Sequence, residues 1–244
     1  MVAMQWSVRS GHLAERAIIA GVTSCVALCV LVGTPGMASA HGSPELAKAK
    51  KALFVLSDMP KGWTSSSSSN NNNQPFPDSA QLAACLGIPT RVINYNAPAV
   101  YSRSFTNKDQ DLTVGDSVQV YPSVKAARQD FAVYAGAKTP HCMTTDLNGN
   151  GKASFAAQLG GGVSVGSVIV TKTPAADYGA HTANITMFFP FTTQEQTINT
   201  ELIIVDFVSG KVEQTVVLSG FQTTFPPSLA RRLTTVADGR IEKE

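Results

Sequence analysis

One serine lies in the sequence context that many hydrolases use for a nucleophile. Residues Gly162 to Gly166 read G-x-S-x-G with Ser164 at the centre, and Asp177 and His181 follow in the order of a hydrolase triad. The motif works in hydrolases because the serine sits on a sharp turn from a strand into a helix. Here β-branched residues typical of a strand follow, and Asp177 and His181 are close neighbours. The pattern favours a glycine-rich entry into a strand, and we expect no catalytic residue.

A second segment matches the first half of a calcium-binding loop. Asp146 to Gly151 reads DLNGNG, which fits D-x-[DN]-x-[DN]-G. Calcium needs six to eight oxygens, and the twelfth loop position should supply a bidentate carboxylate. That position is Ala157. The sequence therefore favours a tight Asx/Gly turn over a calcium site.

Metal and cofactor chemistry find little support elsewhere in the chain. His41, His141 and His181 follow the N-terminal apolar stretch, and none has a second ligand at helical or hairpin spacing. Neither a Walker loop nor a dinucleotide fingerprint is present. We therefore expect no metal site and no cofactor.

The N-terminus has the pattern of a secretory signal. Two arginines precede an apolar stretch over residues 17–32, and Ala38-Ser39-Ala40 follows. A basic start, an apolar stretch and a small-x-small tail predict a signal peptide over residues 1–40. We expect residues 41–244 to form one secreted domain, with no membrane span after cleavage. Retention as a short anchor and lipidation at Cys25 stay open as alternatives.

Two cysteines remain if the leader is removed. Cys85 and Cys142 would then lie in an oxidising compartment, where two cysteines most simply pair. The alternative is two separate buried thiols. The formal net charge of the whole chain is only +2, so nothing attracts nucleic acid over long range.

The hydrophobic periodicity predicts an α+β fold. Serine or proline signals mark helix starts near Ser43, Ser123 and Pro226, and Asp78 begins a helix that ends near Gly87. Short turns between strands argue for an antiparallel sheet of about six strands, with the helices packed on one face. The expected strands are 101–106, 112–121, 163–171, 182–191, 200–208 and 212–219, with a Ser209-Gly210 hairpin turn, a loop over 141–151 and a mobile Ser/Asn-rich loop over 65–76.

Several segments together resemble a known group of exported proteins. Leu53 to Trp63 reads LFVLSDMPKGW, Ala84 to Gly87 reads ACLG, and Ser117 to Ser123 reads SVQVYPS before a helix that leads to Cys142. In this order, over residues 44–238, they are similar to the extracellular sensor-like domains of mycobacterial PknH-type receptor kinases and to related free-standing actinobacterial exported proteins.

The resemblance implies an α+β fold with a cleft for an unidentified ligand, and it carries over no catalytic residue. The chain departs from the kinase-linked domains because it has no kinase domain, one mature cysteine pair instead of two, and no convincing lipobox. Any signal must therefore pass to another molecule. Trp63 and Tyr101 are candidate residues of a ligand cleft, with core or rim packing as the alternative.

These observations favour a non-enzymatic extracytoplasmic binding or sensor-like protein of the cell envelope. Its expected partner is a small-molecule ligand, a lipid or an envelope protein, and not nucleic acid. Two other functions stay open: a secreted serine hydrolase that uses Ser164, and a purely structural envelope protein.

Overall fold

The computed structural model describes residues 44–66, 79–93, 97–153, 156, 163–173, 182–193 and 196–242. The expected signal peptide over residues 1–40 lies outside these ranges, as do Asp177 and His181. Within the described ranges, no helix is both long and apolar enough to cross a membrane.

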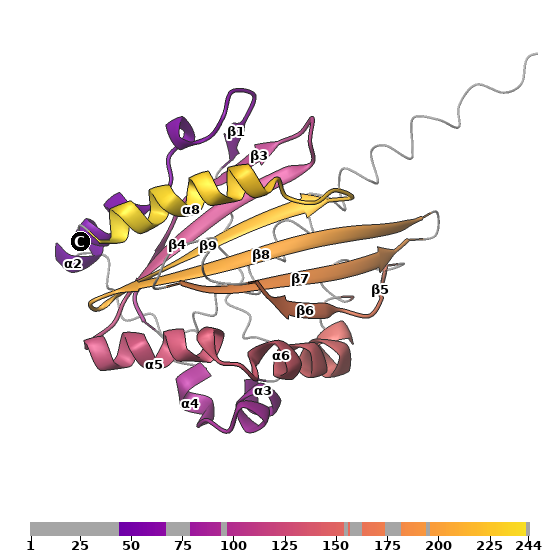
Figure 1. The fold of residues 1–244 in the computed structure, drawn as a ribbon, viewed down its shortest axis with the longest axis horizontal. Coiled ribbons are helices and arrows are strands. Elements are labelled where there is room, and N and C mark those ends of the chain that lie inside the picture. The colour runs from indigo at the N-terminus through magenta and orange to yellow at the C-terminus, as the bar shows by residue number, and fades with distance from the viewer. Residues whose placement is uncertain are drawn as a thin grey trace, which may run out of the picture.

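One antiparallel sheet runs through the described residues, and it confirms the α+β class (Figure 1). Its strand order is β1-β3-β4-β9-β8-β7-β5, while β2 also pairs with β4 and β6 with β7. The strands are β1 (Thr64–Ser66), β2 (Ala99–Tyr101), β3 (Ser104–Asn107), β4 (Leu112–Val120), β5 (Ser164–Val165), β6 (Ile169–Lys172), β7 (Thr182–Thr192), β8 (Thr197–Ser209) and β9 (Val212–Phe221).

The sheet has nine strands where about six were expected. The expected strand over 101–106 divides into β2 and β3, and the one over 163–171 divides into β5 and β6. Strand β1 is the further addition: its Ser65 and Ser66 begin the run that we expected to be a loop. The rest of that run, residues 67–76, lies outside the described part of the chain.

The turn between β8 and β9 lies one residue later than expected. Ser209 pairs with Val212, which leaves Gly210 and Lys211 as the two loop residues. Gly210 has a φ of 56°, and a positive φ at the first loop position suits glycine in the primed turns that hairpins favour.

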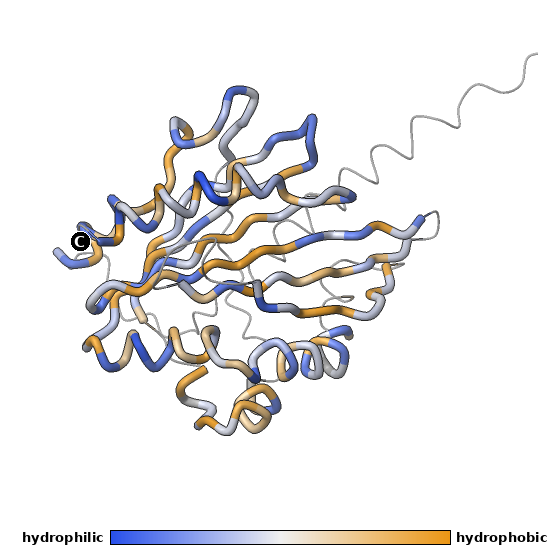
Figure 2. The backbone as a smooth tube through the Cα atoms, viewed as in Figure 1, coloured by the Kyte–Doolittle hydropathy of each residue, from blue (hydrophilic) through white to orange (hydrophobic). Residues whose placement is uncertain are grey.

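The helices cover both faces of the sheet, so the expectation of helices on one face is wrong. Figure 1 shows α8 (Pro227–Ile241) and α2 (Pro44–Ala49) on one side and α3 (Ser79–Leu86), α4 (Thr90–Ile93), α5 (Val124–Ala135) and α6 (Thr139–Asp146) on the other. Ile203 and Val205 of β8 pack in the core under α8, whereas Leu202 and Ile204 pack with α3 and α6. Because strand β8 is apolar on both sides, both sides need a cover. Figure 2 shows long hydrophobic stretches along the central strands.

The segment before β1 is tied to the last helix. It continues from α2 through the 3₁₀ turns η1 (Lys50–Ala52) and η2 (Leu56–Asp58). The guanidinium of Arg240 in α8 donates to an Asp58 carboxylate oxygen at 2.7 Å and to the Leu53 carbonyl at 2.9 Å. These bonds hold the segment, which includes α2, against α8.

Local signals placed the helix ends well in two cases. Gly87 follows α3 with a φ of 72°, as expected for a glycine that ends a helix. Ser123 caps α5, because its Oγ accepts the Ala126 N–H at 3.1 Å.

The expectation of a loop over residues 141–151 is wrong. This segment forms most of α6 and a following π-helical turn, η3 (Leu147–Gly151). Pro140 in the first turn of α6 favours a helix start. The Asn148 side-chain amide donates to the Val168 carbonyl at 2.7 Å, and its oxygen accepts the Val168 N–H at 2.9 Å. The distant segment just before β6 thus stabilises a stretch whose composition suggests a turn.

Candidate functional site

A group of polar side chains is buried between α5 and the sheet. Paired residues of neighbouring antiparallel strands point to the same face, and the register aligns Ser117 with Thr215 and Asp206, and Gln119 with Glu213. Ala127 of α5 packs on Tyr121 and Val208 beside them, which places this face under α5. We call the following set the polar layer: Ser117, Gln119, Tyr121, Asp206, Glu213 and Thr215 from the sheet side, and Asp130 and Tyr134 from α5.

Two hydrogen bonds of the polar layer meet at the Tyr121 hydroxyl. The Tyr121 hydroxyl lies 2.9 Å from Oε1 of Gln119 and 2.8 Å from Oδ2 of Asp130. The hydrogen bond that Tyr121 donates to Asp130 stabilises the ionised carboxylate, and so does a hydrogen bond with Glu213, so both oppose the increase in the pKa of Asp130 that burial causes.

Burial raises the pKa of every carboxyl group in the polar layer. It raises the pKa of Asp206 to about 7 and that of Asp130 to about 6, and it raises the pKa of Glu213 well above its ordinary value. The charge of Asp130 adds to the increase for Asp206 and Glu213. Among the described residues, no lysine or arginine charge acts to lower these pKa values.

Burial, with the neighbouring acidic charges, also raises the pKa of the Tyr134 hydroxyl. The charges that act on it belong to Asp130, Asp206 and Glu213. Tyr134 therefore lies close to all three carboxyl groups and stays a neutral phenol.

Several buried oxygens of the polar layer make no hydrogen bond of good geometry. They are both carboxylate oxygens of Asp206, Oε2 of Glu213 and Oγ of Ser117, on side chains that are 1%, 2% and 0% exposed. The Thr215 hydroxyl is near enough to lower the pKa of Asp206, although no well-directed bond joins them. Buried polar groups are normally hydrogen-bonded, so these oxygens can still accept hydrogen bonds.

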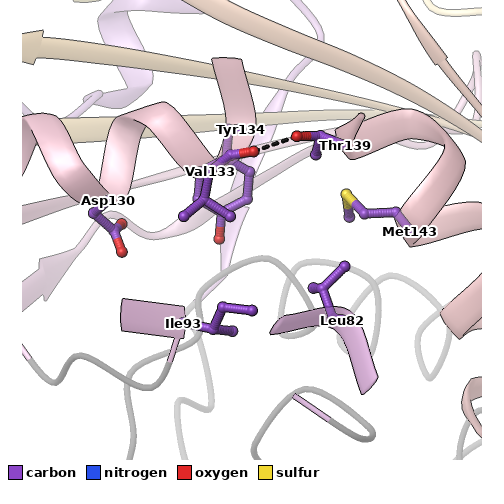
Figure 3. Close-up of a pocket in the computed structure, with 7 residues that line it drawn as sticks. All are labelled: Leu82, Ile93, Asp130, Val133, Tyr134, Thr139 and Met143. Carbon is purple, nitrogen blue, oxygen red and sulfur yellow. Dashed lines mark hydrogen bonds between the residues drawn. The ribbon is translucent and has the colours of Figure 1, made fainter. Parts of the chain in front are cut away.

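A small pocket adjoins the polar layer between two pairs of helices (Figure 3). About 20 Å³ is open to the centre of a water-sized group, which is room for one small chemical group. Asp130 and Tyr134 belong to both the pocket and the polar layer. The lining comprises Leu82 of α3, Ile93 of α4, Asp130, Val133 and Tyr134 of α5, and Thr139 and Met143 of α6.

Two contacts fix the helices that form the pocket. Cys85 of α3 and Cys142 of α6 form a disulfide, which confirms the expected pairing. The Thr139 hydroxyl donates to the Val133 carbonyl, and this bond holds the start of α6 against the end of α5 (Figure 3). The disulfide and this hydrogen bond therefore connect three of the four helices that line the pocket.

The two aromatic residues predicted to line a cleft do not come together. Trp63 is buried in the core under α8, next to Phe54 and Met59. Tyr101 pairs with Ser117 and so shares the opposite face of the sheet, where burial raises its pKa. The structure thus assigns Trp63 to core packing and places Tyr101 at the edge of the polar layer.

Sequence reasoning missed the acidic residues of the site. Asp130 follows Ala127 by three positions and precedes Tyr134 by four, which places it within the apolar stripe of α5. Asp206 interrupts the apolar run IIVDFV of β8. The sequence did offer a signal for these residues: hydrophobic periodicity assigns their positions to the core, where a charged residue is unusual.

Ser164 lies in β5, paired with Thr192, and the chain continues through residues 166–168 to β6. This is a strand-to-strand setting instead of the strand–turn–helix that a nucleophile elbow uses. A Cβ on Gly166 would lie 2.7 Å from a Pro190 side-chain carbon, so close packing explains that glycine. The expected partners of Ser164, Asp177 and His181, lie outside the described residues.

The DLNGNG segment also takes another form than a calcium loop. Asp146 ends α6 as a buried residue, and the next five residues form η3 instead of the expected tight turn. In the part of the chain that the structure describes, no three His, Cys, Asp or Glu side chains are placed to hold a metal ion. His141 lies in α6 next to the disulfide-bonded Cys142, and His41 precedes the described residues.

Comparison with known proteins gives only weak likeness of fold. No family model and no curated protein matches the chain. Among solved structures, the crystal structure of the extracellular domain of PknH from Mycobacterium tuberculosis aligns with a TM-score of 0.40 and 13% identity, over 84% of this chain and 100% of that domain. This is a distant likeness of fold, to a domain of the group that the sequence motifs resemble.

Proposed function

We propose that this protein is a non-enzymatic, extracytoplasmic binding protein that acts in a sensor-like way, with the pocket between α3–α4 and α5–α6 as its ligand site. The observation that carries the proposal is the junction of this pocket with the polar layer at Asp130 and Tyr134. Ligand sites typically combine apolar walls with a few convergent polar groups.

The energetics of the polar layer support a role beyond folding. Carboxyl groups buried without a cationic partner lower stability, and apolar residues of similar volume often stabilise such a position better. Asp206 and Glu213 are nevertheless held in the sheet beneath α5. Strongly perturbed pKa values beside a pocket favour a functional site.

The disulfide supports the extracytoplasmic part of the proposal. Stable disulfides are typical of oxidising compartments, and Cys85–Cys142 links two of the helices that form the pocket. The predicted leader over residues 1–40 fits this location. The size of the pocket fits one small group of a ligand, and it is too small for a buried lipid chain.

Native mass spectrometry of protein secreted by its own host tests the proposal. We expect a stoichiometric non-covalent adduct on the wild-type chain. Val133→Phe should remove the adduct, because this 9% exposed side chain lines the pocket, whereas Val124→Phe, at a 40% exposed position on the same helix, should keep it.

Three outcomes would contradict the proposal. A bare wild-type chain would favour a structural envelope protein. An adduct that persists on folded Val133→Phe, with folding checked by the intact disulfide and circular dichroism, would place the ligand elsewhere. Labelling by a fluorophosphonate probe that disappears in Ser164→Ala would show a serine hydrolase.

A further inference from the structure

We infer that the surface formed by α8 and residues 44–62 docks on a lipid bilayer that carries anionic headgroups. We call this surface the basic face. It lies on the opposite side of the sheet from the helices that line the pocket (Figure 1), so the inference goes beyond the proposed function. Its two features are an exposed apolar turn and the cationic side chains around that turn.

Two large apolar side chains are exposed at the turn η2. Val55 is 51% exposed and Leu56 is 45% exposed. Phe54 and Met59, on either side of them in sequence, are buried in the core under α8. The Val55 N–H donates to an Asp58 carboxylate oxygen at 2.8 Å, and the Asp58 N–H donates to the Val55 carbonyl at 2.9 Å. The turn is therefore fixed, and exposed apolar groups rimmed by polar residues are typical of contacts with a protein or a membrane.

Two arginines of α8 hold this turn against the helix. Arg232 donates to the Asp58 carbonyl at 2.7 Å, and Arg240 donates to an Asp58 carboxylate oxygen at 2.7 Å. The turn and α8 thus form one continuous surface. Because the Asp58 carboxylate is paired with Arg240, its negative charge is offset on the face itself.

Positive charge is concentrated on the basic face. Residues 44–62 and 227–242 hold seven lysines and arginines against four acidic residues, a formal net charge of +3. The whole chain carries +2, so all other residues together carry −1. An anionic surface is therefore attracted to this face more than to the rest of the molecule. The exposed cationic residues are Lys48, Lys50, Lys51, Lys61, Arg231 and Arg232.

An anionic bilayer complements both features at once. Its headgroups attract the cationic side chains, and the acyl boundary just beneath them can take up Val55 and Leu56. Lysine side chains are long enough to keep their ammonium groups at headgroup level while their stems lie along apolar surface. An acidic protein would supply the charge without the apolar layer beneath it.

The chain itself also favours this orientation. Residues 33–43 connect the apolar stretch over 17–32 to Pro44, where the basic face begins. Eleven residues span at most about 40 Å when fully extended. If the apolar stretch is retained as an anchor, the chain holds the basic face close to the membrane.

Vesicle sedimentation of protein secreted by its own host tests the inference. We expect vesicles of equimolar phosphatidylglycerol and phosphatidylcholine to bind at least about tenfold more tightly than vesicles of phosphatidylcholine alone, because each cation near an anionic surface strengthens binding about fivefold. Raising the salt concentration from about 0.05 M to about 0.5 M should weaken this binding at least about tenfold, because salt screens exposed charges.

Two double substitutions separate the apolar contribution from the cationic one. Val55→Asp/Leu56→Asp removes the apolar contact, and Lys50→Glu/Lys51→Glu reverses two of the exposed charges. Each should weaken binding to the anionic vesicles at least about tenfold. All four positions are exposed, so circular dichroism should show an unchanged fold.

Matched controls lie outside the basic face. Val124→Asp/Ile169→Asp makes the same chemical change at apolar positions that are 40% and 55% exposed in α5 and β6. Lys125→Glu/Arg128→Glu reverses two exposed charges on α5. Both controls should bind the anionic vesicles within about twofold of the wild-type chain, because the attraction falls off within a Debye length of the surface.

The outcomes also separate this inference from the proposed function. Equal binding to neutral vesicles, no binding to either kind, or binding that survives either substitution in the basic face would overturn the membrane assignment. Controls that lose binding as strongly as these variants would overturn it too. Val133→Phe should lose the native adduct and still bind the anionic vesicles, so the pocket and the basic face can each fail alone.

Discussion

At the scale of single residues, Asp116 and Asp206 show two ways to bury a carboxyl group. Asp116 faces α8, and both its oxygens lie 3.2 Å from the Phe54 N–H, while Gln214 donates to it at 2.8 Å. The same Gln214 amide donates to the Ala52 carbonyl at 3.1 Å. Burial still raises the pKa of Asp116 to about 6, although its hydrogen bonds and the Arg240 charge oppose the increase. Asp116 is a structural link between the N-terminal segment and the sheet, whereas Asp206 lacks such partners.

Asp116→Ala should therefore destabilise the fold strongly. The substitution leaves the Phe54 N–H without its acceptor and Gln214 with one acceptor fewer in the core, and unsatisfied buried groups of this kind cost about 3 kcal/mol together. Urea unfolding at pH 7.5 measures the change. Asp109→Ala, at an exposed turn, is the matched control and should change stability by less than about 0.5 kcal/mol. A similar small effect for Asp116→Ala would show that these bonds add little.

Residues whose role is local were predictable from the sequence, and residues whose role depends on distant partners were not. Ser123 caps its own helix and Gly87 ends its own helix, so short-range patterns suffice. Asp130 and Glu213 acquire their properties from each other across α5 and β9. No local pattern reveals that pairing, because it depends on how a helix lies on a sheet.

At the scale of elements, the Cys85–Cys142 disulfide joins α3 to α6, two of the helices that line the pocket. Cys85 and Cys142 are 57 residues apart in sequence, and Asn148 fixes the turn after α6 to Val168, just before β6. The cysteine pairing was predictable because two cysteines allow one pairing. The helical form of residues 139–151 was not, since Asn148 obtains its partner from a segment twenty positions away.

Loss of the disulfide should lower the free energy of unfolding by about 4 kcal/mol. The reason is that a cross-link between residues 57 positions apart restricts the conformations of the unfolded chain. Urea unfolding of Cys85→Ala/Cys142→Ala measures the loss. The wild-type protein in reductant serves as the matched comparison and should show the same shift in midpoint. An unchanged midpoint in both samples would contradict the expected contribution of the disulfide.

At the scale of the whole molecule, the central strands decide that helices must lie on both faces of the sheet. In β8, the run Leu202 to Val205 is buried at every position, with alternate residues in the two cores. A half-exposed strand would alternate apolar and polar residues instead. The continuous run was readable in the sequence. Which helix covers which face depends on the packing of the whole chain.

The polar layer should make the protein more stable at mildly acidic pH than at alkaline pH. The folded-state pKa values of Asp130 and Asp206 lie above the ordinary value of 3.8, so the folded chain binds more protons than the unfolded chain between about pH 4 and 7. The resulting stabilisation is present below the unfolded pKa and is lost as pH rises through the folded values. We expect the free energy of unfolding to fall by about 3–4 kcal/mol between pH 5 and 8. Urea unfolding across this range measures the change.

Asp206→Asn should make the free energy of unfolding depend less on pH, because it removes one of the two groups that bind the extra protons. If the stability of the wild-type chain instead rises with pH, the carboxyl groups of the layer are already ionised and solvated in the folded protein.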